Sequence, residues 1–510
     1  MAAAWTGSCV ADCALVNFAA DVLDAAPRGD RALVEIDATG ARREWTFAEV
    51  SDVSARLAGT LLARGARRGD VVMTVIGSRP QWVLTMVACF RIGAVVLPCN
   101  EQLRSKDLRI RIEAAAPRLI VSDERNSGEL SAALASAGDG GGGLSRAEPP
   151  TVILIPDPSL LDSEPAPPVD LAPTDPCLIT FTSGTTGGAK GIVHGQRYLA
   201  GQALQASTWL GARRGDLVWC TAASGWSKSA RNAFIAPWLQ GAAALLHDAR
   251  FDADQRLQVL ASERVNVLCM APTEYRVIAK RTALRPIRSL RGLVAAGEAL
   301  NPEVLRVFRE GMGLPIRDGY GQTETGQLTG VPAGGEVRPG SMGRPLPGVA
   351  LAVIDDELVL TDPTTDPTFF VGYLNGDPAP QDEPWHTGDR VTADEDGFLF
   401  FQGRTDDLII SSGYRIGPFE VESALVSHAA VAEAAAVAAP DEERGSVVRA
   451  VVVLRDGIEP SDALKAELQD HVKAETAPYK YPRIVDFAAE LPKTASGKVQ
   501  RSLLRSRPVS

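Results

Sequence analysis

Short apolar runs alternate with longer amphipathic segments throughout the first 330 residues of the chain. Runs rich in β-branched residues are typical of buried strands, and the longer segments have the spacing of helices with one apolar face. This alternation predicts an α/β fold in which helices cover sheets of parallel strands. The runs predicted to be strands are 71–77, 118–123, 151–156, 176–181, 216–221, 242–247, 265–270 and 291–296. So many strands require more than one sheet, and we predict two.

The pattern changes twice in the remainder of the chain. Residues 349–401 contain short strands and turns, which predict a small β subdomain. Farther on, a helix is expected to start at Pro418, residues 448–454 have the composition of a strand, and 461–475 have the periodicity of an amphipathic helix. We therefore predict a large N-terminal domain and a smaller, mobile C-terminal α+β domain behind a hinge. The predicted domains cover residues 1–404 and 405–510.

The composition is that of a globular protein large enough for several domains. The 510 residues are 45% hydrophobic and 23% charged, and the net charge of -11 argues against nucleic acid as the main partner, because phosphate backbones attract basic surfaces. The most apolar stretch, 82–99, contains Arg91, Gly93 and Pro98, so we predict a helix, a turn and a strand rather than a membrane span. The N-terminus lacks the pattern of a secretory signal, so a cytoplasmic location is expected.

The cysteines are odd in number and scattered. Buried free thiols in a reducing compartment are the simplest interpretation. The seven positions are 9, 13, 89, 99, 177, 220 and 269. The sequence leaves the oligomeric state open, a homo-oligomer included.

The sharpest local signal is a loop rich in glycine and hydroxyl groups, residues 182–191, directly after the predicted strand 176–181. Glycines let backbone N–H groups approach an anion closely, the Ser and Thr hydroxyls add donors, and Lys190 adds a positive charge. A polyphosphate requires these groups, whereas a flexible linker rarely follows a buried strand directly. A P-loop NTPase is disfavoured, because Lys190 lies between Ala189 and Gly191 rather than before Ser or Thr.

Further segments follow this loop in an order and at spacings that resemble the adenylate-forming superfamily of acyl-CoA synthetases, luciferases and peptide-synthetase adenylation domains. They are AAGEALNPEV (295–304), RDGYGQTET (317–325), PGSMGRPLPG (339–348), WHTGD (385–389), GRTDDLIISSGYRIGPFEVE (403–422) and LPKTASGKVQR (491–501). Each alone is a weak signal, but the resemblance covers nearly the whole chain. It implies a ligase that uses ATP to form an acyl-adenylate and pyrophosphate, and then passes the acyl group to coenzyme A with release of AMP. The implied substrates and cofactors are a carboxylic acid, ATP, Mg²⁺ and coenzyme A.

The resemblance also implies where the nucleotide binds. Tyr320 would lie against the adenine, Thr323 would bond to the α-phosphate, Asp389 would accept from the ribose hydroxyls and Glu324 would hold magnesium. The phosphates would lie on Thr182, Ser183, Gly184, Thr185, Thr186, Gly187 and Lys190. The rest of the nucleotide site would be formed by Gly297, Glu298, Ala299, Asp318, Gly319, Gly321, Gln322, Arg404 and Arg415. No other metal is expected, since the five histidines show no ligand spacing.

The reaction itself is implied to depend on the C-terminal part. Lys498 would orient the substrate carboxylate and the α-phosphate and neutralise the transition state, so the predicted catalytic residues are Lys498, Thr323 and Glu324. The small domain would then turn about the hinge residue Asp406. This turn would bring in the loop of Ser412, Gly413 and Tyr414. Candidates to meet the phosphates of coenzyme A are Arg444, Lys473 and Arg483, for which ordinary surface charge is the alternative.

Two stretches, 216–242 and 476–487, look most like medium-chain acyl-CoA synthetases, and 271–276 agrees with them. This implies a medium-chain or short branched fatty acid, with Trp226 and Tyr275 shaping the acyl pocket. Ala189 stands where the family usually has proline, and Ala223 where relatives carry aspartate, which puts the usual substrate range in doubt. An aryl or other specialised acid, or delivery of the adenylate to a carrier protein, remains open. A nucleotide-binding regulator without catalysis is a further alternative.

Overall fold

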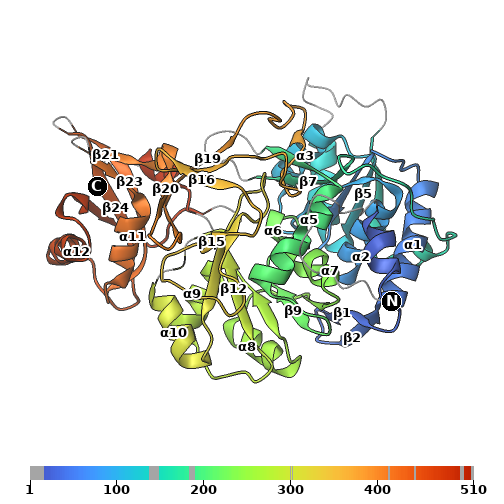
Figure 1. The fold of residues 1–510 in the computed structure, drawn as a ribbon, viewed down its shortest axis with the longest axis horizontal. Coiled ribbons are helices and arrows are strands. Elements are labelled where there is room, and N and C mark those ends of the chain that lie inside the picture. The colour runs from blue at the N-terminus through green and yellow to red at the C-terminus, as the bar shows by residue number, and fades with distance from the viewer. Residues whose placement is uncertain are drawn as a thin grey trace.

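The computed structural model describes residues 17–136, 149–182, 190–298, 300, 302–411, 414–441, 444–493 and 499–506. Among these residues, no helix is both long enough and apolar enough to cross a membrane. The elements of the C-terminal part, coloured orange to red in Figure 1, lie at the opposite end of the molecule from the first helices and strands.

One large sheet contains seven strands, of which the central ones are parallel. Its order is β18 (Gly372–Tyr373), β8 (Gly191–Gly195), β7 (Pro176–Phe181), β4 (Val95–Cys99), β3 (Val71–Val75), β5 (Leu119–Asp123) and β6 (Thr151–Ile155). The edge strands β8 and β18 are antiparallel. Helices of this part of the chain are α1 (Phe47–Ala63), α2 (Pro80–Ile92), α3 (Ser105–Ala115) and α4 (Ser127–Ser136).

The second large sheet contains nine strands and again has a parallel centre and antiparallel edges. Its order is β15 (Arg344–Pro345), β14 (Thr329–Gly330), β13 (Ile316–Tyr320), β12 (Gly292–Ala296), β11 (Val267–Cys269), β9 (Leu217–Cys220), β10 (Ala243–His247), β1 (Arg31–Ile36) and β2 (Arg42–Thr46). The helices that follow its strands are α6 (Ser227–Ala230), α7 (Ala236–Leu239), α8 (Ala253–Ser262), α9 (Pro272–Arg281) and α10 (Pro302–Met312), whereas α5 (Arg197–Gln205) follows β8 of the seven-stranded sheet.

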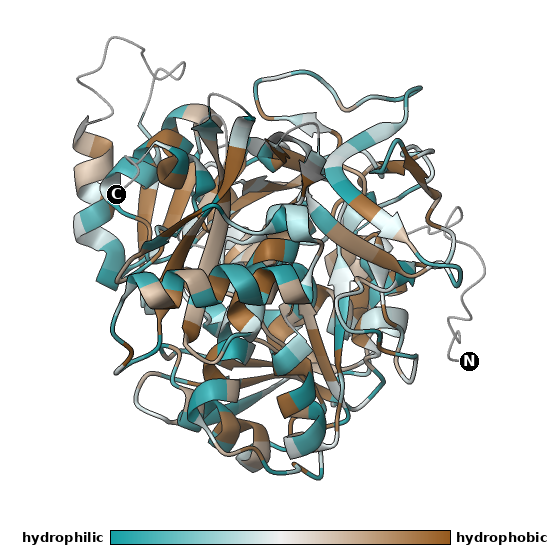
Figure 2. Ribbon diagram, turned by 90° about the vertical axis from the view of Figure 1, so that its left-hand side faces the viewer, coloured by the Kyte–Doolittle hydropathy of each residue, from teal (hydrophilic) through white to brown (hydrophobic). Residues whose placement is uncertain are grey.

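The main core joins the two sheets. It contains side chains from both, such as Val72 and Val96 of one and Leu33 and Ala244 of the other, together with the apolar faces of α1 and α2. Neighbouring residues on the same strands, such as Met73, point to a separate core under α3 and α4. Strands buried on both faces explain why their sequences are continuously apolar. Figure 2, in which the C-terminal side of the molecule faces the viewer, shows strands that are largely hydrophobic behind helices with hydrophilic outer faces.

Local signals explain several element ends. Thr46 caps α1 and forms a capping box with Glu49, in which each side chain bonds to the other residue's backbone. Gly93 adopts the left-handed conformation that ends α2 before β4. Pro418 occupies the first turn of α11 (Pro418–Ser427).

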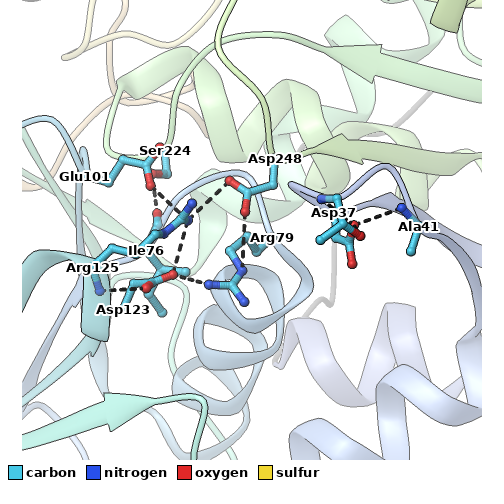
Figure 3. A network of polar contacts seen from close by, with 10 residues as sticks. Asp37, Ala41, Ile76, Arg79, Glu101, Asp123, Arg125, Ser224 and Asp248 are labelled. Carbon is cyan, nitrogen blue, oxygen red and sulfur yellow. Dashed lines mark hydrogen bonds and ion pairs between the residues drawn. The ribbon is translucent and has the colours of Figure 1, made fainter.

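An ion-pair network ties the two sheets together near the carboxyl ends of their strands (Figure 3). Asp123, at the end of β5, pairs with Arg79 and lies 3.2 Å from the guanidinium of Arg125. Asp248, just after β10, lies 3.7 Å from Arg79 and 3.2 Å from Arg125, and Glu101 completes the network. Both arginines therefore have carboxylate partners from more than one segment.

The remaining chain forms a small sheet and a separate C-terminal unit. The small sheet consists of β16 (Leu351–Ile354), β17 (Glu357–Leu360), β19 (Trp385–Ala393) and β20 (Leu399–Arg404). The C-terminal unit comprises β21 (Ile409–Ser411), β22 (Tyr414–Ile416), α11, β23 (Val431–Asp441), β24 (Gly445–Leu454), α12 (Asp462–Glu475), β25 (Ile484–Phe487) and α13 (Arg501–Arg505). It has its own hydrophobic core. The predicted α/β class is confirmed, with a large N-terminal part of several sheets and a smaller C-terminal part. The domain limits 1–404 and 405–510 and the mobility of the C-terminal domain stay predictions.

Candidate active site

A cavity of about 690 Å³ lies where the carboxyl ends of the parallel strands meet loops of the small sheet. Cys99 ends β4, Phe181 ends β7, Ala296 ends β12 and Tyr320 ends β13, and all four line it. Ligands of open α/β sheets bind at this edge, because the backbone there leaves room that side chains of the following loops can line. The cavity is therefore the candidate active site.

Asp389 is the centre of a hydrogen-bond network on one wall. Its Oδ2 accepts from the hydroxyl of Tyr320 at 2.5 Å and from Nε2 of Gln322 at 2.8 Å, and its Oδ1 lies 3.2 Å from Nη1 of Arg404. Trp385 in turn donates to Oε1 of Gln322 at 3.0 Å, which fixes the amide. Burial, and next the negative charge of Asp389, raise the pKa of Tyr320, so its hydroxyl stays a donor. The wall thus presents an aromatic ring beside a fixed carboxylate.

Glu324 lies on a second wall. Burial raises the pKa of its carboxyl, and the hydroxyl of Tyr373 lies 3.5 Å from its Oε1. Lys190 lies over the ring of Tyr373, with its Nζ 5.3 Å from the ring centre. Lys190, Tyr373 and Thr182 all line the cavity. A buried carboxyl beside a lysine is an arrangement suited to a cation together with an anionic ligand.

The third wall is formed by the segment after Trp226 and the end of β12. Nζ of Lys228 donates to the carbonyl of Ala296 at 3.0 Å. Glu298 pairs with Arg276 at 2.6 Å. Burial raises the pKa of Asp318 to about 8, so this carboxyl is largely protonated at neutral pH.

Most of the predicted nucleotide residues meet in this cavity. Those that line it are Thr182, Lys190, Gly297, Glu298, Asp318, Gly319, Tyr320, Gly321, Gln322, Thr323, Glu324, Asp389 and Arg404, with Trp226 of the predicted acyl pocket. Other predicted residues lie outside the described part of the chain: Ser183, Gly184, Thr185, Thr186, Gly187, Ala299, Ser412, Gly413, Lys498 and the side chains of Asp406 and Arg415.

Tyr275 is not brought to the cavity. Its side chain is fully buried between α9 and the sheet, with its hydroxyl 3.2 Å from the carbonyl of Val294 and its ring edge-on to Phe308. An aromatic residue inside a helix–sheet core fills space there. The prediction that Tyr275 shapes the acyl pocket is therefore corrected: it packs the core beneath the cavity wall.

The predicted coenzyme A residues lie in the C-terminal unit. Lys473 and Arg483 both lie against the ring of Tyr481, at 4.4 and 5.0 Å from its centre. Tyr414 is half exposed and stacks on Tyr479 at 4.3 Å. The backbone N–H of Arg444 donates to Asp441 at the turn before β24. None of the four lines the cavity as described here.

Sequence reasoning missed three basic residues that line the cavity: Arg111, Lys228 and Arg231. Arg111 lies over the ring of Phe181, with its Cζ 5.1 Å from the ring centre. The available signal was the presence of two cations, Lys228 and Arg231, just after the predicted pocket residue Trp226.

Comparison with known proteins matches residues 21–365 to the AMP-binding enzyme family and residues 420–498 to the AMP-binding enzyme C-terminal domain. The chain belongs to the AMP-binding enzyme family. Similar members include the uncharacterized acyl–CoA ligase YtcI of Bacillus subtilis, 38% identical with 93% of each chain covered. Mitochondrial acyl-coenzyme A synthetase ACSM4 of Rattus norvegicus is 39% identical, with 96% of this chain and 90% of that protein covered. The resemblance to acyl-CoA synthetases predicted from the sequence is confirmed.

Solved structures of the family have the same fold. An acyl-CoA synthetase of Brucella canis is 34% identical, with a TM-score of 0.71 over 96% of this chain and 94% of that one. The anthranilate CoA ligase AuaEII, in complex with anthranoyl-AMP, is 27% identical, with a TM-score of 0.86 over 96% of this chain and 97% of that one.

Proposed function

We propose that the chain is an ATP-dependent carboxylic acid–CoA ligase. In the first step a carboxylate oxygen of the acid attacks the α-phosphorus of ATP, and the bond to pyrophosphate breaks. In the second step the thiolate sulfur of coenzyme A attacks the acyl carbon, and AMP leaves. The observation that carries the proposal is the convergence of Tyr320, Asp389, Glu324 and Lys190 on one cavity, from segments far apart in the chain.

The Asp389 network supports binding of the nucleoside. A carboxylate held in place by Tyr320, Gln322 and Arg404 is an oriented acceptor for the hydroxyls of a ribose. The ring of Tyr320 and the backbone of Gly297 line the same cavity and offer two surfaces for a flat adenine. Gly297 has a positive φ of 103°, which favours glycine, and a Cβ there would lie 3.1 Å from Nζ of Lys228.

The phosphates and their cation belong on the Glu324 wall. Thr182, Lys190 and Thr323 line the cavity, and the sequence predicts that residues 183–187 also bind the phosphates. Glu324 fits Mg²⁺, because its partly buried carboxyl has no cationic ion-pair partner among the described residues and a divalent cation would stabilise its ionised form. Magnesium would neutralise charge on the phosphates.

The C-terminal unit supplies the remaining groups of the proposed mechanism. Lys498 would contact the reacting carboxylate and α-phosphate, and a turn at Asp406 would then bring Tyr414 toward the site for thioester formation. The basic residues Lys473 and Arg483 flank Tyr481, and an aromatic ring between two cations is a surface suited to a phosphorylated nucleotide.

The acid is proposed to be aliphatic and of medium or short branched length. The support is the 37–39% identity to mitochondrial acyl-coenzyme A synthetases of the ACSM group over 96% of the chain, and the position of Trp226 on the cavity wall. A cytoplasmic location stays a prediction.

Acid-dependent exchange of labelled pyrophosphate into ATP tests the first step without requiring coenzyme A. We expect exchange with Mg²⁺ and a suitable acid, and its loss in Lys498→Ala. The same variant should still form thioester from supplied acyl-adenylate and coenzyme A. Equal loss of both steps would contradict the separate role of Lys498, and no exchange with any acid of a broad panel would favour a nucleotide-binding regulator.

A further inference from the structure

Arg231 is a buried cation on the cavity wall without a counter-charge. It begins η5 (Arg231–Ile235), directly after α6, and is 4% exposed. Its Nε and Nη1 are buried and make no hydrogen bond within the described residues, and no described carboxylate forms an ion pair with it. Arg231 is nevertheless one of the residues that line the cavity.

The neighbouring groups do not neutralise it. The side chain of Tyr198 forms a hydrogen bond with that of Arg231, and the ring of His194 lies near the guanidinium. Burial raises the pKa of Tyr198, and burial lowers the pKa of His194 to about 3, so both rings are uncharged at neutral pH. Tyr198 and His194 lie against each other, with ring centres 4.0 Å apart.

Other buried arginines described in this protein have protein partners. Arg91 pairs with Asp24 at 2.7 Å, Arg256 with Glu274 at 3.0 Å and Arg449 with Asp486 at 2.6 Å. Arg317 instead donates to backbone carbonyls, including that of Trp209 at 2.5 Å. The partly buried Arg79 and the exposed Arg125 in Figure 3 also have carboxylate partners. The protein therefore compensates buried guanidinium groups elsewhere, which makes Arg231 an exception that faces a cavity.

The wall around Arg231 is positively charged. Lys228 lies three residues earlier and donates to a backbone carbonyl, not to a carboxylate. Arg111 lies across Phe181. Glu298, the acid on the same wall, is already paired with Arg276. Asp389 and Glu324 belong to the walls proposed for ribose and magnesium.

We infer that the acid carries a second carboxylate, which Arg231 binds on the cavity wall formed by the segment after Trp226. This inference rests on the proposed ligase function and narrows its substrate to dicarboxylic acids. A guanidinium can form two parallel hydrogen bonds with a carboxylate, and no carboxylate among the described residues uses the donors of Arg231, so a second carboxylate matches it in charge. A buried cation without a counter-charge is unfavourable, and a dianionic substrate supplies the missing charge.

The test compares acids of equal length with the full chain. Pyrophosphate release is measured with hexanoate against hexanedioate, and octanoate against octanedioate, for wild type, Arg231→Met, Arg231→Lys and Arg306→Met. Arg306 is exposed on α10 and pairs with neighbours on its own helix, so it is a matched Arg→Met control. AMP binding, measured by calorimetry, reports whether the nucleotide site of each variant is intact.

We expect wild type to prefer the dicarboxylate in kcat/KM, and Arg231→Met to lose about 10- to 100-fold on the dicarboxylate relative to the monocarboxylate. Arg231→Lys should keep part of the preference, and Arg306→Met all of it. Preference of wild type for the monocarboxylate overturns the inference even if a variant fails to fold, while leaving the ligase function standing. Equal loss on both acids in Arg231→Met also overturns it, since that would place Arg231 at the reacting carboxylate. No release with any acid would instead count against the ligase function.

Discussion

Asp389→Asn tests the nucleotide site with the smallest change of shape. An amide offers only one oxygen acceptor, whereas Asp389 uses both oxygens. The oxygen that faces Tyr320 and Gln322 accepts two hydrogen bonds, and the other faces Arg404, whose side chain is 39% exposed. The asparagine should therefore turn its oxygen toward Tyr320 and Gln322 and its NH₂ toward Arg404, because this sacrifices the weaker and more solvated contact.

The magnitude follows from this orientation. Loss of a partly exposed ion pair costs about 1 kcal/mol of stability or less. The effect on ATP is larger, because the ribose hydroxyls would meet a neutral amide instead of a carboxylate, and hydrogen bonds to charged groups contribute about 1.5–3 kcal/mol. We therefore expect ATP affinity to fall by about 10- to 100-fold while the melting temperature falls by only a few degrees.

Calorimetric titration of ATP and thermal unfolding measure the two effects separately. Asp486→Asn is a matched control, because Asp486 is a buried carboxylate paired with Arg449 in the C-terminal unit, away from the cavity. It should lower stability without changing ATP affinity. Asp389→Asn that binds ATP like wild type, with lower stability only, would show that the network is structural and does not hold the ribose.

Three further predictions concern single side chains. Glu324→Gln should lower the rate of pyrophosphate release by about 10²- to 10³-fold and raise the Mg²⁺ concentration needed, and an unchanged magnesium titration would remove Glu324 from the metal site. Burial raises the pKa of Asp318 from 3.8 to about 8. Between pH 4 and pH 8 the folded protein therefore keeps a proton on this carboxyl that the unfolded chain has lost, so the free energy of unfolding should decline as pH rises from about 4 to 8. Asp318→Asn should flatten that decline in melting temperatures, and an unaltered slope would show that the carboxyl is ionised in the folded protein. Tyr275→Phe should cost about 1 kcal/mol of stability and leave the KM for the acid unchanged, and a raised KM would return Tyr275 to the acyl pocket.

The sequence predicted those parts of the fold that depend on neighbouring residues. The turn at Gly93 and the helix start at Pro418 are both set within one or two turns of chain, and the structure contains both of them. Central strands such as β4 and β12 could be predicted because burial on both faces makes them continuously apolar. The antiparallel edge strands β2 and β8 gave no comparable signal, since their pairing depends on partners elsewhere in the chain.

The site was predicted unevenly for the same reason. Tyr320 and Asp389 belong to extended motifs, and the structure brings them into hydrogen-bond contact although they are 69 residues apart. Tyr275 was misplaced because a single aromatic residue gives no indication of which face of α9 it occupies. Arg231 was missed because a basic residue in a sequence is usually exposed, and only the structure shows its burial and its unpaired nitrogens.

The most direct measurement of the central claim follows oxygen atoms. An acid labelled with ¹⁸O in its reacting carboxylate is incubated with the protein, ATP, Mg²⁺ and coenzyme A, and the products are examined by mass spectrometry. If the carboxylate attacks the α-phosphorus and the thiol then displaces AMP, one labelled oxygen must appear in AMP and none in pyrophosphate. Label in inorganic phosphate or pyrophosphate, or thioester formed with unlabelled AMP, would contradict the acyl-adenylate route.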